Sequence, residues 1–224
     1  MKKIAIAIDG PAAAGKSTVA KLVAKNLGFT YIDTGAMYRA VTVYCLRNGV
    51  DCQNDEEVNK VISNIEIELL PDHKVLLNGE DVTFDIRTPK CADNVSYIAA
   101  NKEVRLFLVE QQRKMAKNTS VVMDGRDIGS YVLPDAEVKI FQIASVETRA
   151  QRRYLENIQK GIECTFESIK AELEKRDYID SHRDFAPLKK ASDAIELDTS
   201  NMSIEEVVNE VLNIINKKVG EINE

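Results

Sequence analysis

Short apolar runs alternate along the chain with longer stretches in which apolar residues recur every three or four positions. Most of the short runs lack alternating polar residues, which is typical of strands in a parallel sheet covered on both faces. Strands that alternate with helices imply crossover connections, so the pattern predicts a doubly wound α/β fold. The five predicted strands are Ile4–Ile8, Thr30–Ile32, Ser120–Met123, Val138–Ile143 and Ala194–Leu197.

Two segments depart from this rhythm. Between Ile65 and Thr83, residues alternate at period two and the pairs Pro71-Asp72 and Asn78-Gly79 mark turns, which predicts a small antiparallel insert. The second departure lies between Ser145 and Pro187, where helical patterns carry many charges, and is here called the charged excursion. We therefore expect a discontinuous core at 1–33, 97–144 and 189–224, an insert at 34–96, and helical arms at 145–188. The final helix, near 203–219, opens with the capping-box pattern Ser203-x-x-Glu206.

A phosphate-binding loop lies between the first predicted strand and a helical stretch, 18–27. Gly10-Pro-Ala-Ala-Ala-Gly-Lys-Ser17 fits G-x-x-x-x-G-K-[ST] without a mismatch, and the strand before it and the helix after it are the required context. The glycines let successive N–H groups converge on phosphate oxygens. Lys16 would reach the β- and γ-phosphates and Ser17 would hold Mg²⁺. The alternative, a glycine-rich turn without function, fits this context poorly.

The composition argues against several classes of function. The 36 acidic and 30 basic residues give a net charge of −6, which argues against a nucleic-acid binder. The four cysteines lie far apart and there are two histidines, so neither a zinc site nor a Cys/His or Ser/His nucleophile is expected. We expect the thiols to be reduced and mostly buried, and we assign no role to His73 or His182.

The N-terminus resembles a signal peptide only superficially. Its apolar run stops after five residues at Asp9, short of the roughly 7–15 that a secretory core needs. No stretch approaches the length of a membrane span. These features predict a cytoplasmic protein without a membrane partner.

Candidate chemistry gathers at the predicted strand ends and in the charged excursion. In a parallel sheet, ligands bind at the carboxyl ends of strands, so Asp33–Arg39 and Asp124–Asp127 should face the phosphate loop. Arg39, taken alone, could be a solvated helix residue, and Arg126 with Asp127 could form a local ion pair in a surface turn. Asp124, at the end of an apolar strand, is placed to orient Mg²⁺ or its waters.

Two sets of charged residues in the charged excursion have helical spacing, and this spacing can be interpreted in two ways. Arg149, Arg152 and Arg153 are spaced to share one helix face, as are Arg176, Asp180 and Arg183. Mixed charges at such spacing usually mean a solvent-facing helix with salt bridges. Phosphoryl transfer, however, needs positioned cations and exclusion of water, which arginines on a mobile segment would supply.

Four motifs together resemble the bacterial cytidylate kinases, a family of nucleoside monophosphate (NMP) kinases. They are Ile8-Asp-Gly-Pro…Gly-Lys-Ser-Thr18, Asp33-Thr-Gly-Ala-Met-Tyr-Arg39, Asp124-Gly-Arg-Asp127 and Lys175-Arg-Asp…Asp180…Arg183…Ala-Pro-Leu188, in the family's order over nearly the whole chain. The resemblance implies a three-layer P-loop NMP-kinase fold with a five-stranded parallel sheet, an antiparallel β-containing NMP-binding insert at 34–96 and a helical lid within 145–188.

The resemblance also implies roles for individual residues. ATP would bind at Gly10, Pro11, Ala12, Ala13, Ala14, Gly15, Lys16, Ser17 and Thr18, with Mg²⁺ at Ser17 and near Asp124, through water. CMP or dCMP would bind at Thr34, Arg39, Ser96, Arg105, Arg126, Asp127, Arg176, Asp180 and Arg183. Of these, Ser96, Arg105 and Asp127 would contact cytosine. Lys16, Arg126, Arg153 and Arg183 would act on the transferring phosphate.

The expected function is therefore transfer of the γ-phosphate of ATP to CMP or dCMP by a monomer, with no nucleic acid involved. Three alternatives remain open. Another small-molecule P-loop kinase, for example one that prefers UMP, would lack the cytosine readers Arg105 and Asp127. A nucleotide-dependent binding switch would show slow hydrolysis without dependence on an acceptor, and a nucleic-acid-processing ATPase would require stimulation by polynucleotide.

Overall fold

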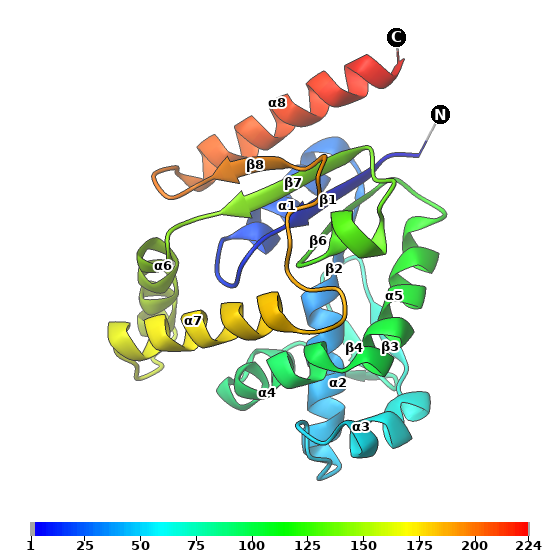
Figure 1. Ribbon diagram of the computed structural model, residues 1–224, viewed down its shortest axis with the longest axis vertical. Helices are drawn as coiled ribbons and strands as arrows, with labels where there is room; N and C mark the ends of the chain where they lie inside the picture. The colour runs from blue at the N-terminus through cyan, green and yellow to red at the C-terminus, as the bar shows by residue number, and fades with distance from the viewer. Residues whose placement is uncertain (1–2, 224) are drawn as a thin grey trace. The chain divides into compact units, whose positions relative to one another are not determined.

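The computed structural model of the protein describes residues 3–223, which form two compact units (Figure 1). One unit combines the chain up to Tyr31 with the chain from Thr119 onward, and the other is Ile32–Asn118. The second unit thus continues past residue 96, where the sequence placed the return of the insert to the core. Among the described residues, no helix has both the length and the apolar character needed to cross a membrane.

A five-stranded parallel sheet forms the centre of the first unit, as the apolar runs predicted. Its order is β2-β6-β1-β7-β8. The strands begin and end within one or two residues of their predicted limits: β1 (Ala5–Asp9), β2 (Thr30–Asp33), β6 (Val121–Gly125), β7 (Val138–Ile143) and β8 (Ile195–Asp198). Asp9 at the end of β1 is in register with Gly125 on one side and Phe141 on the other. Three carboxyl ends therefore meet beside the phosphate loop.

Two helices cover one face of this sheet, α1 (Lys16–Leu27) and α8 (Ile204–Asn223). Ile6, Ile8 and Ile140 point to that face and pack with apolar residues of both helices. Lys139 points the opposite way, because side chains alternate along a strand. Its methylenes lie against Gly129 of the π-helical turn η3 (Ile128–Val132), which places this turn on the other face.

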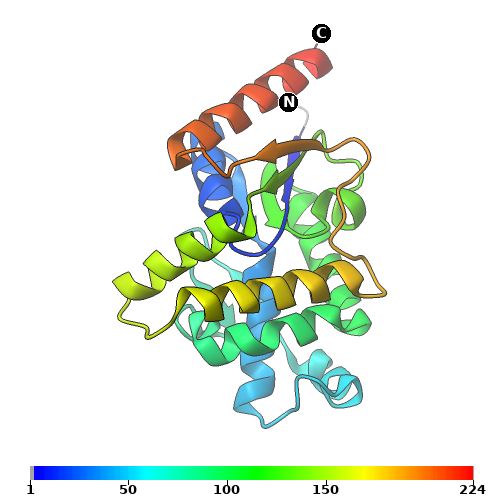
Figure 2. The ribbon, with the colours of Figure 1, turned by 60° about the vertical axis from the view of Figure 1, so that its left-hand side comes forward.

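The cap of α8 confirms the predicted capping box. The Ser203 hydroxyl accepts from the Glu206 amide at 3.2 Å, and the Glu206 carboxylate accepts from the Ser203 amide at 2.8 Å. Two further helices form the charged excursion, α6 (Val146–Gln159) and α7 (Phe166–His182). They lie side by side in both views (Figures 1 and 2).

The second unit contains the predicted antiparallel insert. Its sheet has the order β3-β4-β5, and Asn78 and Gly79 turn the chain between the last two strands with φ of 51° and 80°. Those positive values are what a tight hairpin requires of an Asn-Gly pair. The elements are α2 (Thr34–Arg47), α3 (Asp55–Val61), η1 (Ile62–Asn64), β3 (Ile67–Leu69), β4 (Val75–Leu77), β5 (Glu80–Asp81), η2 (Asp85–Arg87), α4 (Pro89–Ala100) and α5 (Lys102–Ala116).

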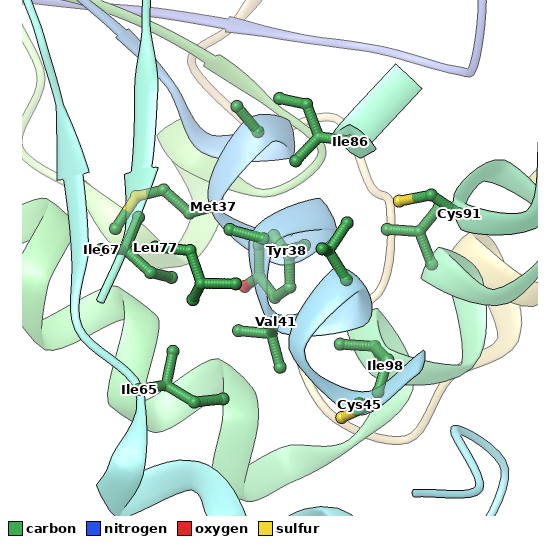
Figure 3. Packing of buried hydrophobic residues seen from close by; sticks show 14 of the residues in the cluster. Met37, Tyr38, Val41, Cys45, Ile65, Ile67, Leu77, Ile86, Cys91 and Ile98 are labelled. Atoms are coloured by element: carbon green, nitrogen blue, oxygen red, sulfur yellow. The ribbon is translucent and has the colours of Figure 1, made fainter. Parts of the chain in front are cut away.

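Helix α2 is the centre of the second unit's core. Figure 3 shows Tyr38 and Cys45 of this helix facing Leu77 of β4 and Ile98 of α4. Nine of the fourteen residues of α2 are buried, because the insert sheet, α4 and α5 pack around it. The four cysteines are free thiols, and all but the partly buried Cys164 are buried, as the sequence predicted.

Candidate active site

The phosphate loop joins β1 to α1 and lies close to the end of β7. A Cβ atom at Gly10 would lie 2.0 Å from the Gln142 backbone oxygen, so only glycine fits there. Ala13 and Gly15 both have positive φ, 56° and 89°. Gly15 immediately precedes α1 and has no side chain to cap it. The first amides of the helix, at the positive end of its dipole, therefore point toward the place where a phosphate would bind.

Three carbonyl oxygens of the phosphate loop accept hydrogen bonds from side chains. Lys16 Nζ donates to the Pro11 oxygen at 2.6 Å, and Gln142 Nε2 donates to the Ala14 oxygen at 2.6 Å. Arg149 Nη1 donates to the Ala12 oxygen at 3.0 Å. These bonds fix the main chain of the loop at three points of its backbone.

Lys16 is buried, and burial is the main reason that its pKa lies well below the usual value. The positive charge of Arg126 lowers this pKa further, while Asp124 and Asp9 raise it. A bound triphosphate adds negative charge at the same place and would favour the protonated amine. The lysine is thus suited to exchange the Pro11 carbonyl for a phosphate.

An oxygen-rich group for Mg²⁺ lies at the start of α1. Ser17 Oγ donates to Asp124 Oδ2 at 2.8 Å, and the Tyr31 hydroxyl donates to the other oxygen of Asp124 at 2.7 Å. Residues 3–223 contain no cluster of three or more His, Cys, Asp or Glu that could hold a metal alone. A hydroxyl and one carboxylate fit Mg²⁺, which takes one or two protein ligands together with substrate phosphates.

A charged cluster follows the end of β6. Arg126 Nε donates to Asp180 Oδ2 at 2.8 Å, and Arg183 Nη2 lies 3.4 Å from Asp127 Oδ1. Burial alone would lower the pKa of Arg126, but the charge and hydrogen bond of Asp180, together with the charges of Asp177 and Asp124, raise that pKa. Burial likewise raises the pKa of Asp180, and Arg126, Arg176 and Arg183 together lower it below its usual value. Arg126 and Asp180 are therefore held in their charged forms by each other.

Arg183 corrects one detail of the sequence analysis. The spacing placed it on one helix face with Arg176 and Asp180, but α7 ends at His182 and the backbone of Arg183 is extended, with ψ of 145°. Its guanidinium still lies 3.9 Å from Asp180 Oδ1. Arg183 Nε donates to the Ala186 oxygen at 2.8 Å, so the segment after the helix holds this arginine in the cluster.

The three arginines of α6 divide into two kinds. Arg149 contacts the Ala12 oxygen, and Arg152 donates to the Thr199 oxygen at 2.7 Å and lies 3.5 Å from the Ala14 oxygen. Arg153 pairs instead with Glu156 on its own helix, at 3.4 Å. Arg149 and Arg152 thus contact the phosphate loop, whereas the role of Arg153 toward the transferring phosphate stays a prediction.

The predicted acceptor residues Thr34, Arg39, Ser96 and Arg105 belong to the second unit. Asp33 caps α2 by accepting from the Ala36 amide at 2.9 Å, which leaves Thr34 buried in the first turn. A Cβ at Gly35 would lie 3.4 Å from the Arg39 guanidinium, so Arg39 folds back toward the start of its helix. Ser96 is buried on α4.

Arg105, on α5, is 1% exposed and is held from two sides. Its Nη1 donates to the Ala99 oxygen at 3.1 Å, at the end of α4. The guanidinium carbon lies 5.4 Å from the centroid of the Tyr38 ring, within the range of a cation–π interaction. An arginine buried in this way has one preferred orientation, which suits a role in recognition.

Two carboxylates, Asp9 and Asp177, lie within the motifs quoted in the sequence analysis but were assigned no role there. Asp9 accepts from the amides of Ile128 and Gly129 at 2.8 and 2.7 Å and so anchors η3, the turn that follows Asp127. Its position directly before the phosphate loop was the available signal. Asp177 accepts from the Ala12 amide at 3.0 Å, and among the mixed charges of α7 no spacing distinguished it.

Comparison with known proteins places the chain in a family. The family model described as cytidylate kinase matches residues 6–217. Curated proteins named cytidylate kinase from Bacillus cereus strain B4264 and Bacillus thuringiensis strain Al Hakam are each 54% identical over 217 residues, which is 96% of this chain and 96% of theirs.

Solved structures with low sequence identity share the fold. A shikimate kinase from Acinetobacter baumannii aligns with a TM-score of 0.50 at 15% identity and covers 96% of this chain and 94% of its own. A gluconokinase from Sinorhizobium meliloti 1021 aligns with a TM-score of 0.51 at 12% identity, covering 99% and 98%. The fold is thus one that these kinases share. The family model and the relatives with 54% identity identify the chain more closely, and it belongs to the cytidylate kinase family.

Proposed function

We propose that this protein transfers the γ-phosphate of ATP to CMP, giving ADP and CDP, and that dCMP serves as a second acceptor. The observation that carries the proposal is the cluster of buried Asp127, Asp180 and Arg183 with half-buried Arg126, which lies in the same unit as a complete phosphate loop. It supplies cations for an acceptor phosphate and a carboxylate for a base. The family membership and the Bacillus relatives named cytidylate kinase support the same activity.

ATP would bind along the phosphate loop from Gly10 to Thr18. The loop amides and the start of α1 would receive the β- and γ-phosphates, and Lys16 would neutralise charge between them. Ser17, with Asp124 behind it, would hold Mg²⁺. When bound, the ion would neutralise phosphate charge and orient the oxygens.

CMP would be recognised by groups that match cytosine. Cytosine presents an N4 amino donor beside the N3 and O2 acceptors, so the Asp127 carboxylate can accept from N4 while Arg105 donates to N3 and O2. Ser96 would add a hydroxyl. Uracil offers an oxygen in place of N4 and an N–H at N3, which would leave both charged side chains wrongly paired.

The arginines Arg39, Arg126 and Arg183 would hold the acceptor phosphate, and Arg176 and Asp180 would bind the ribose hydroxyls. Thr34 would contribute its hydroxyl at the start of α2. Asp180 already pairs with Arg126, so a ribose hydroxyl that donates to Asp180 would join an existing charge network.

The reaction needs no covalent intermediate with the enzyme. An oxygen of the CMP phosphate attacks the γ-phosphorus in line while the bond to the ADP oxygen breaks. Lys16, Arg126, Arg183 and Arg153 would stabilise the charge that spreads over the transferring group. Positioning of the two nucleotides and this neutralisation supply most of the acceleration.

A coupled assay of ADP release tests the proposal. The purified protein is given ATP and Mg²⁺ with CMP, dCMP, UMP, AMP or GMP as the only acceptor. We expect turnover with CMP and dCMP, weaker turnover with UMP and only background with the purines. Preference for UMP would support the pyrimidine kinase alternative, and slow ATP hydrolysis unaffected by any acceptor would support the binding switch.

The size of the active species is tested in the same preparation. We propose that the protein acts as a monomer on free nucleotides. Size-exclusion chromatography with light scattering should give a mass close to 25.0 kDa. A mass of twice that value, or activity that requires added polynucleotide, would contradict this part of the proposal.

A further inference from the structure

Ala12 of the phosphate loop is held at both of its backbone polar groups. Its amide donates to Asp177 Oδ1 at 3.0 Å, and its carbonyl oxygen accepts from Arg149 Nη1 at 3.0 Å. The same Nη1 lies 2.5 Å from the other carboxylate oxygen, Asp177 Oδ2. The three residues therefore close a ring of hydrogen bonds, here called the Ala12 clamp.

The clamp is anchored in the core. Arg149 is 7% exposed, and its Nε donates to the Ala144 oxygen at 2.9 Å, just after β7 ends. Apolar contacts surround the clamp, because Ala12 packs with Ala150 of α6 and Leu173 of α7. Both helices of the lid region are thus tied to one residue of the loop.

The clamp adjoins a strained residue. Ala13 has φ of 56°, in the left-handed region that costs free energy for any residue with a Cβ. Such a conformation persists where the surrounding structure enforces it. Since the peptide between Ala12 and Ala13 carries the oxygen that Arg149 binds, the clamp constrains the chain as it enters the left-handed turn.

We propose that Asp177 is a positioning residue for the phosphate donor, and this inference rests on the proposed function. With Arg149, it keeps the loop in the conformation whose later amides receive the triphosphate. A carboxylate suits this role, because hydrogen bonds to a charged acceptor are stronger than those to a neutral one, and one oxygen serves the amide while the other serves the guanidinium. Asp177 acts on the nucleotide through the loop.

Steady-state kinetics of Asp177→Asn and Asp177→Ala test the inference. The asparagine variant retains an oxygen for the Ala12 amide but turns an NH₂ group toward Arg149, so it should be affected less than the alanine variant. We expect the KM for ATP to rise about tenfold or more in Asp177→Ala, and the KM for CMP to stay within about twofold of the unmodified protein. Glu174→Ala, an exposed carboxylate of α7, is the matched control and should change neither constant.

A second measurement separates positioning from general weakening of the fold. In a cycle of Asp177→Ala, Arg149→Ala and the double variant, the double variant should lose little beyond the worse single variant, since both break the same ring. Isothermal titration with ADP should show the same order of losses without any turnover. If Asp177→Ala fails to fold, Asp177→Asn carries the test.

Three results would overturn the inference: an unchanged KM for ATP and unchanged ADP affinity in the variants that fold, an equal rise in both KM values, or fully additive losses in the cycle. Absence of CMP phosphorylation by the unmodified protein would instead refute the proposed function. The two failures are therefore distinguishable.

Discussion

Buried charge is the dominant feature at the scale of single residues. Asp9, Lys16, Arg105, Asp127 and Asp180 are each at most 5% exposed, and burying a charge is costly unless it is paired or will meet a partner. Salt bridges offset part of this cost within the Arg126–Asp180 pair. Charges buried for stability alone would be expected to be rare, so the concentration of these side chains at one end of the main sheet and on α5 is itself a sign of function.

The first prediction concerns the carboxylate that is proposed to read cytosine. Asp127→Ala should lower kcat/KM for CMP by about 5- to 150-fold, which corresponds to the loss of about 1–3 kcal/mol for one base-specific contact. The KM for ATP should change far less. Because the discriminating acceptor is gone, the preference for CMP over UMP should shrink. An unaltered CMP to UMP ratio would refute the base-reading role.

The second prediction concerns pH. Burial raises the pKa of Asp9 to about 7, despite two amide hydrogen bonds and Lys16, which lower it; Asp127 raises it further. Because the folded state then keeps a proton that the unfolded state loses from about pH 4, this residue makes the free energy of unfolding fall as pH rises toward about 7, by up to about 1.4 kcal/mol per pH unit.

Urea denaturation at about pH 5 and about pH 8 checks the sign of this effect. The unfolding free energy of the unmodified protein minus that of Asp9→Asn should fall as the pH rises, since asparagine does not titrate. A rise of this quantity with pH would show that the Asp9 carboxylate is stabilised in its charged form, and the pKa would then lie below its usual value.

At the scale of helices and strands, the residues that cap a helix determine where its functional side chains lie. Asn101 separates α4 from α5, and its side-chain oxygen accepts from the Val104 amide at 3.0 Å while its amide donates to Asp55 at 2.8 Å. This one side chain caps α5 and ties it to the start of α3. Arg105 lies in the first turn of α5, so the cap that fixes the start of the helix also fixes the position of this arginine.

The third prediction follows from this junction. Asn101→Ala should destabilise the protein by about 1–2 kcal/mol, because it removes a cap and leaves Asp55 without its amide donor. The change is measured by urea denaturation. Asn94→Ala, within α4, is the control and should be neutral or slightly stabilising, since alanine is the better helix former. Equal effects at both positions would contradict the assigned cap.

At the scale of the whole molecule, the proposed acceptor residues are shared between two units: the first holds Arg126 and those that follow it along the chain, together with the phosphate loop, and the second holds the others. The phosphate loop belongs entirely to the first unit, whereas Arg39, Ser96 and Arg105 belong to the second. Each unit has its own apolar core, one around the parallel sheet and one around α2. Changes at the acceptor residues of the second unit should therefore leave donor binding unaffected.

The fourth prediction tests this separation with a pair of variants. Arg105→Met keeps the length of the side chain but removes its donors, and should raise the KM for CMP about tenfold or more with little change in ADP affinity. Lys16→Met should show the reverse, with ADP affinity reduced, CMP affinity retained and turnover abolished. Both sets of affinities are measured by calorimetry. Loss of both affinities in either variant would contradict the division.

The sequence predicted the main sheet because an apolar run such as Ile4–Ile8 is typical of a strand that is buried on both faces. The insert followed from its period-two pattern and from Asn78-Gly79. The sequence did not reveal contacts that depend on tertiary geometry. Asp177 is one carboxylate among many in α7, and only the fold brings it to Ala12. The end of α7 before Arg183 also escaped the spacing argument, because no proline or glycine marks it.

The close approach of Gly10 to the Gln142 backbone has a consequence for anyone who diversifies this chain. The obstacle is main-chain atoms of β7, which no compensating change of a neighbouring side chain can move away. No other residue is therefore expected to be tolerated at position 10. In a library that randomises the whole loop, most members would carry a residue other than glycine there and would be inactive.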